Sequence, residues 1–87
     1  MALIARFEEI SGNRHAVHGS VECGWRFFKV DGKQILQLET YGSDEREFKG
    51  KVSQSIQLDE SSAAKLLEII DRSFPTLVRR LSDRGAP

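Results

Sequence analysis

The ten residues FFKVDGKQIL, Phe27 to Leu36, decide how this chain folds. At their centre, Asp31-Gly32 is a strong signal for a two-residue hairpin turn, since both turn positions need a positive φ that these residues tolerate. Aromatic and branched residues flank the turn on both sides, as strands prefer. We therefore predict two antiparallel strands, over residues 17–30 and 33–41, that meet at this turn.

A two-residue turn also fixes which residues lie opposite each other, and opposed residues share a face of the sheet. One predicted face pairs apolar residues and looks like core against a helix: Phe27 with Leu36, Trp25 with Leu38, and Cys23 with Thr40. The other predicted face is mixed: Val30 with Lys33, Phe28 with Ile35, Arg26 with Gln37, and Glu22 with Tyr41.

Alternating residues predict two further strands, over residues 2–10 and 51–58. After Leu58 the apolar residues recur at spacings of three and four, so we predict an amphipathic helix over residues 60–73. Asp59 is its expected N-cap and Pro75 ends it, before a short helical tail at about 76–82. The sequence thus predicts one α+β domain over residues 1–87, a four-stranded antiparallel sheet followed by a C-terminal helix.

Composition sets bounds on the class of protein. The chain has 87 residues, with 13 basic and 13 acidic side chains and a formal net charge of zero. Strongly cationic nucleic-acid binders carry a basic surplus, so this balance counts against that class. No apolar run reaches the roughly 18 residues of a membrane span, and the N-terminus does not resemble a signal peptide. With its single cysteine, the chain is expected in a reducing, cytoplasmic (or nucleoid-associated) setting.

Neither metal binding nor catalysis is indicated. His15, His18 and Cys23 supply three candidate ligands, but strand positions three apart point to opposite faces. The carboxylates of Asp44, Glu45 and Glu47 lie in a charged loop without a sign of the split pKa values that acid–base catalysis needs. We expect no cofactor, no metal and no enzymatic activity.

The mixed face is the candidate binding surface, because aromatic side chains interleaved with cations can stack bases and follow phosphates. The alternative is that this face packs against a second subunit or the N-terminal strand. On the fourth strand, polar residues share one parity, and they either line the same groove or simply face water: Lys51, Ser53, Ser55 and Gln57.

The segment GWRFFKVDGKQILQLETYG, the charged loop after it and KGKVSQSIQLDESSAAKLLEII resemble the positive-cofactor-four family of transcriptional coactivators over residues 24–70. That resemblance implies a homodimer built largely through the helices, with single-stranded DNA lying over the strands. Glu39 or Gln37 stands where the family has a basic residue, and Ser53-Gln54-Ser55 replaces its strand glycine. The resemblance points to eight binding residues: Arg26, Phe28, Lys33, Gln37, Tyr41, Lys49, Lys51 and Ser53.

We therefore expect a small non-enzymatic domain that binds single-stranded nucleic acid, DNA rather than RNA, as a homodimer through its helix. Phe28 and Tyr41 would stack bases, and the nearby cations would contact phosphates. The alternative is a protein-interaction module or regulatory subunit that binds no nucleic acid. The apolar positions of the helix cover more than one stripe, which favours a second partner surface in either case.

Overall fold

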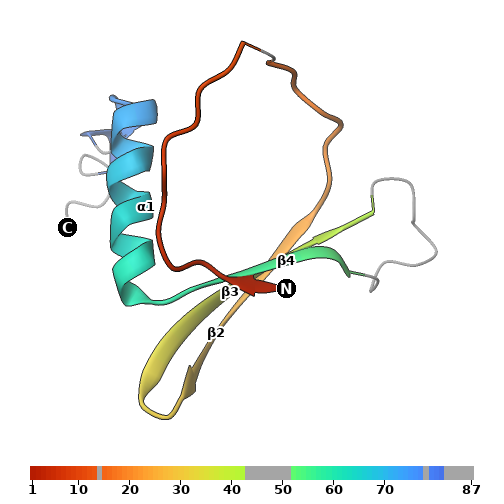
Figure 1. Cartoon of the computed structure of the whole chain (residues 1–87), viewed down its shortest axis with the longest axis vertical. Helices are drawn as coiled ribbons and strands as arrows, with labels where there is room; N and C mark the ends of the chain where they lie inside the picture. The colour runs from red at the N-terminus through yellow and green to blue at the C-terminus, as the bar shows by residue number, and fades with distance from the viewer. Residues whose placement is uncertain (14, 43–51, 78, 82–87) are drawn as a thin grey trace.

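The computed structural model describes residues 1–13, 15–42, 52–77 and 79–81 (Figure 1). The element order is β1 (Ala2–Leu3), β2 (Cys23–Val30), β3 (Lys33–Tyr41), β4 (Val52–Leu58) and α1 (Glu60–Ser73). The four strands form one sheet in the order β1-β4-β3-β2. The prediction of a four-strand, one-helix α+β architecture is confirmed.

The hairpin between β2 and β3 has the predicted turn and register. Asp31 and Gly32 both have positive φ, 51° and 77°, as a type I′ turn requires. The strand pairs are those expected from the turn, including Trp25 with Leu38 and Phe28 with Ile35. The turn pair therefore set which side chains share a face along the full length of β2.

The prediction that the sheet is entirely antiparallel is wrong, because β1 pairs with β4 in parallel. Ala2 lies opposite Ile56 and Leu3 opposite Gln57, and the Ile4 N–H donates to the Gln57 carbonyl at 2.9 Å. Alternation along a strand indicates which faces its side chains take, but it carries no information on the direction of the neighbouring strand.

The predicted strands at the start of the chain are too long. Only Ala2–Leu3 of the predicted 2–10 strand pairs with the sheet, and β2 begins at Cys23 rather than at residue 17. Figure 1 shows why: after β1 the chain leaves the sheet, runs beside α1 and arches back to β2. Alternating residues without a neighbouring strand have no ladder to join, so they stay extended without forming a strand.

The helix α1 has the predicted limits, Glu60 to Ser73. The Asp59 carboxylate accepts from the Ser62 backbone N–H at 3.0 Å, and the Ser62 hydroxyl accepts from the Asp59 N–H at 3.1 Å. This reciprocal capping box satisfies two backbone donors that the first turn would otherwise leave unpaired. Leu77 and residues 79–81 are also helical and Thr76 lies in a turn, while positions 78 and 82 of the predicted 76–82 tail lie outside the described residues.

The helix does not cover the apolar face of the sheet as predicted. It contacts the sheet mainly at β4 and stands to one side of it, next to the N-terminal segment (Figure 1). Within the described residues, only Ile35 and Leu58 are buried apolar side chains. Trp25 remains 72% exposed and Phe27 59% exposed. The residues predicted as core do share one face of the sheet, but that face is largely exposed in the single chain, so its prediction as core is wrong for one protomer.

Candidate functional site

The sheet has two faces of different chemistry, which the strand register defines. The aromatic face carries mainly apolar side chains, namely Trp25, Phe27, Leu36, Leu38, Ile56 and Leu58. The glutamine face carries mainly polar ones around two apolar side chains, namely Arg26, Phe28, Ile35, Gln37, Glu39, Ser55 and Gln57. The glutamine face is the predicted mixed face.

A hydrogen-bonded row crosses the glutamine face from β4 to β2. The Gln57 amide donates to the Gln37 side-chain carbonyl at 2.8 Å, and the Gln37 amide donates to the Glu39 carboxylate. The Arg26 guanidinium, which is mostly exposed, lies 3.5 Å from the same carboxylate. Because Gln37 is only 7% exposed and bonded on both sides, its amide holds the sheet together rather than facing a ligand.

Ser55 lies opposite Glu39 on β4, at the edge of this row. Its hydroxyl oxygen is buried and has no hydrogen-bond partner in the described part of the chain. Burying a hydroxyl without a hydrogen-bond partner costs free energy of folding. No contact within the described chain offsets that cost at Ser55.

Tyr41 lies over Gly24. A Cβ placed on Gly24 would come within 2.6 Å of the Tyr41 hydroxyl oxygen, so the glycine makes room for the ring. Arg26 follows Gly24 on the same face, and Phe28 follows Arg26. The structure thus brings three of the predicted binding residues together in the order Tyr41, Arg26, Phe28, with both aromatic rings half-buried.

The other predicted binding residues are dispersed or fall outside the described chain. A bulge at Thr40/Tyr41 shifts the register, and the Ser53 hydroxyl lies 3.0 Å from the Thr40 hydroxyl. Thr40 pairs with Gln54 on the aromatic side, so Ser53 leaves the row that Ser55 and Gln57 form. Lys33 is exposed at the hairpin end. Lys49 and Lys51 lie outside the described residues, so their placement stays a prediction.

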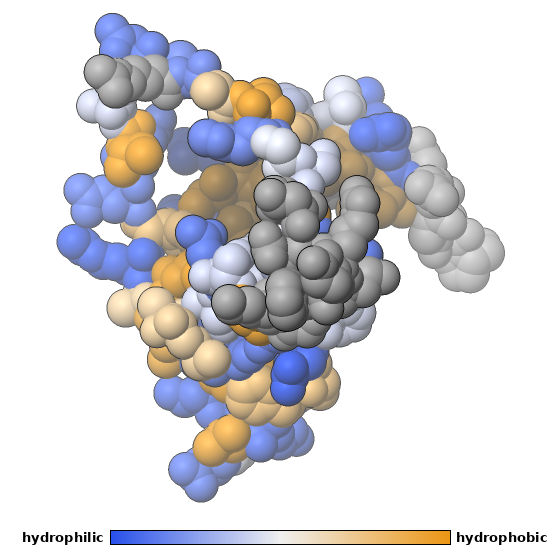
Figure 2. Space-filling model, turned by 90° about the vertical axis from the view of Figure 1, so that its right-hand side faces the viewer, coloured by the Kyte–Doolittle hydropathy of each residue, from blue (hydrophilic) through white to orange (hydrophobic). Residues whose placement is uncertain are grey.

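The aromatic face, which the sequence predicted as core, and one side of α1, which the sequence predicted as a partner surface, are both exposed apolar surfaces. On α1, Leu67 is 65% exposed, and Phe74 at its C-cap is 60% exposed. Figure 2, which views the molecule from the right-hand side of Figure 1, shows hydrophobic residues (orange) among hydrophilic ones (blue). The signal for this surface was present in the sequence as the unusually broad apolar arc of the helix.

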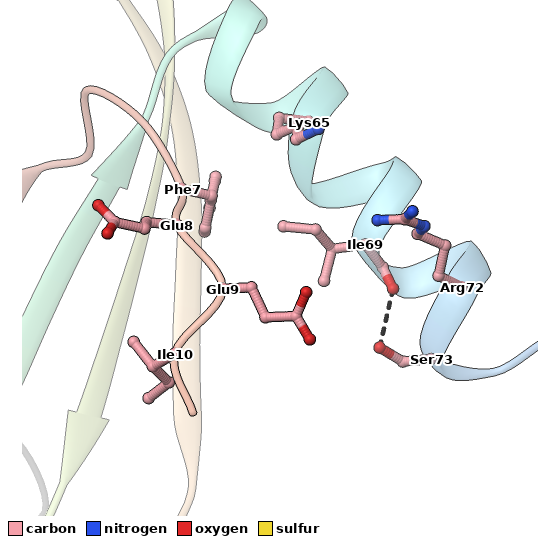
Figure 3. Close-up of a pocket in the computed structure, with 8 residues that line it drawn as sticks. All are labelled: Phe7, Glu8, Glu9, Ile10, Lys65, Ile69, Arg72 and Ser73. Atoms are coloured by element: carbon pink, nitrogen blue, oxygen red, sulfur yellow. Dashed lines mark hydrogen bonds between the residues drawn. The ribbon is translucent and has the colours of Figure 1, made fainter. Parts of the chain in front are cut away.

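A cavity of about 810 Å³ separates the N-terminal segment from α1 (Figure 3). Phe7 and Glu9 project into it from one wall and Ile69 from the other. Lys65 and Arg72 lie on the helix wall, so acidic and basic groups stand on opposite sides. Apolar and charged side chains both line the gap.

In the described residues, no cluster of three or more His, Cys, Asp or Glu side chains is placed to hold a metal ion. No helix in the described part of the chain is long and apolar enough to cross a membrane.

Comparison of the chain with protein-family models, with curated proteins and with solved structures found no match. The resemblance to the positive-cofactor-four family therefore stays a prediction from the sequence.

Proposed function

We propose that this chain is a non-enzymatic protein-interaction module that works as a homodimer. The observation that carries the proposal is its excess of exposed surface. The chain exposes 8006 Å², whereas a compact monomer of 9.8 kDa exposes about 5,200 Å². Trp25, Phe27, Leu67 and Phe74 belong to that excess. Exposed apolar patches of this kind mark interaction surfaces in soluble proteins.

Charge is consistent with self-association. The 13 basic and 13 acidic residues balance, so two copies meet without net repulsion. The paired Arg26 and Glu39, together with the buried Gln37, further reduce the cationic surface offered to a polyanion. These features favour a protein partner over nucleic acid as the first ligand to test.

Light scattering coupled to size-exclusion chromatography tests the proposal. We expect a mass of twice 9.8 kDa at micromolar concentration. A monomer across a dilution series up to about 100 μM would contradict the homodimer, because obligate interfaces of this size normally associate far below that concentration.

Single-stranded nucleic-acid binding on the glutamine face is the second candidate. The observation that favours it is the run formed by Tyr41 of β3, which lies over Gly24, and by Arg26 and Phe28 of the edge strand β2, with exposed Lys33 at the hairpin end. Half-buried rings beside an outward guanidinium can stack bases and contact phosphate. The resemblance to the coactivator family favours DNA over RNA.

Fluorescence anisotropy with labelled single-stranded DNA and RNA at two salt concentrations tests this candidate. We expect Arg26→Ala and Lys33→Ala to weaken binding and to flatten its salt dependence. Lys29→Ala is the matched control. Lys29 pairs with Gln34 and lies on the aromatic face, opposite the glutamine face. Absence of binding at low salt, or an equal loss with Lys29→Ala, would rule out this face.

A further inference from the structure

Two apolar surfaces of the described chain remain uncovered. The first is the aromatic face, defined above. The second is the helix flank, formed by Ala63, Leu67, Ile70 and Phe74, which recur at spacings of three and four. Trp25, Phe27, Leu67 and Phe74 are all more than half exposed, so each surface lacks most of its packing partners.

In this structure the chain does not bring its own helix flank onto its aromatic face. Only Asp59 separates β4 from α1, and its capping box fixes where the helix starts. Trp25 and Phe27 are on β2, two strands away from β4, which is about 10 Å across the sheet. Another side of α1, with Ile69, faces the N-terminal segment (Figure 3). A single copy therefore leaves both surfaces open.

The chain as a whole exposes more surface than a compact monomer, and the two apolar surfaces contribute part of that excess. The excess surface of the chain is about 2,800 Å² over the value for a compact monomer of its mass. Permanent homodimers bury about 1,000–2,500 Å² on each protomer. The excess therefore leaves room for one interface of that size over both apolar surfaces.

We propose that in the homodimer the helix flank of each protomer packs on the aromatic face of its partner. A two-fold axis makes such a contact reciprocal, so the helix flank and the aromatic face of both protomers are covered in one arrangement. The inference rests on the proposed homodimer and specifies its geometry: helix on sheet rather than helix on helix.

Charges at the edges of the two surfaces fit this arrangement. Lys29 is the one charged side chain among the described strand residues of the aromatic face. On α1, Asp71 follows Ile70 and lies one turn from Leu67, so it borders the helix flank. When the helix flank packs across the partner's β2, Asp71 of one protomer and Lys29 of the other lie at the same edge of the interface, with opposite charges.

Charge substitutions on the two surfaces test the geometry. Phe27→Glu and Leu67→Lys each place a charge at an exposed position, so neither empties the core. Because each occurs twice in a symmetric dimer, we expect either variant alone to raise the dimer dissociation constant roughly 100-fold or more. Mixed together, they should form a heterodimer with one intact contact and one Glu–Lys contact.

Light scattering and native mass spectrometry of each variant and of the 1:1 mixture give the readout, with circular dichroism confirming that each variant is folded. A mixture that stays monomeric overturns the helix-on-sheet contact. So does a Phe27→Glu variant that remains dimeric while Leu67→Lys does not, which is the pattern of helix-on-helix packing. A wild-type chain that is monomeric instead overturns the proposed homodimer itself.

Cross-linking provides a second measurement that does not depend on introduced charge. In a Cys23→Ser background, chains carrying Phe27→Cys and Leu67→Cys separately are mixed and oxidised. The proposal predicts a disulfide between the two different chains, because the two positions come into contact across the interface. Disulfides that form only between like chains, or none at all, contradict it.

Discussion

Gln57 on β4 donates its side-chain amide to the side-chain carbonyl of Gln37 on β3 at 2.8 Å. Gln37 is 7% exposed, so this hydrogen bond is shielded from solvent. Gln37→Ala removes the partner of the Gln57 amide and one of the two partners of the Glu39 carboxylate, and we expect a loss of about 1–3 kcal/mol in the free energy of unfolding. Urea denaturation measures this, with exposed Gln54→Ala on β4 as the control. Equal effects of the two substitutions would contradict the structural role of Gln37.

The close approach of Tyr41 to Gly24 predicts a strong coupling between these positions. Gly24→Ala places a methyl group 2.6 Å from the Tyr41 hydroxyl oxygen, so the ring must move, at a cost of about 1–3 kcal/mol. In a Tyr41→Phe background the same substitution should cost much less, because the hydroxyl is gone. A double-mutant cycle by urea denaturation gives the coupling. Gly19→Ala, which meets nothing within 4 Å, is the control, and additive effects would contradict the contact.

The capping box predicts acid sensitivity at the start of α1. Hydrogen bonds from the Ser62 backbone N–H and hydroxyl lower the pKa of the Asp59 carboxyl below its ordinary value of 3.8. A folded-state pKa below the unfolded one stabilises the fold above the unfolded pKa, and that contribution is lost as pH falls through the lower folded value. We expect wild type to lose helicity below about pH 3.8 by circular dichroism, and Asp59→Asn to lose less over the same range.

At neutral pH, Asp59→Ala should lower the melting temperature by roughly 4–8 °C, whereas Asp59→Asn, which keeps an acceptor, should change it little. Thermal unfolding followed by circular dichroism measures both. A larger loss with Asp59→Asn than with Asp59→Ala would show that the cap does not act through its hydrogen bonds.

Trp25 is the one tryptophan of the chain, and it is 72% exposed in the single protomer. In the proposed homodimer a partner covers it, so its fluorescence emission should lie at shorter wavelength than that of a solvated indole. Dilution below the dissociation constant, or the Leu67→Lys substitution, should shift the emission to longer wavelength. Emission typical of solvated tryptophan at every concentration would place Trp25 outside any interface.

Local chemistry made much of this fold predictable. Asp31-Gly32 determined the turn, and with it the register of β2 and β3, because a two-residue loop leaves only one pairing. The change of period after Leu58 and the Asp59 cap gave α1 its limits. These signals act over a few residues, which is why they can be read from the chain alone.

Features that depend on distant partners were not predictable in this way. The parallel pairing of Ala2 with Ile56 depends on the path of the whole N-terminal segment. The bulge at Thr40/Tyr41 moves Ser53 off the row of Ser55 and Gln57, although all three have the same parity in the sequence. The register of the mixed face was predicted correctly, but the burial of Ile35 and Gln37 and the pairing of Gln37 with Glu39 required coordinates.

The two-residue strand β1 has a consequence for the order of assembly during synthesis. Ala2 finds its partner, Ile56, only after about fifty further residues have emerged from the ribosome. The β2–β3 hairpin closes over a two-residue loop and can form long before that. Ala2 and Leu3 are therefore among the last residues of the fold to be placed, and until then the outer edge of β4 is open to the strand of another nascent chain.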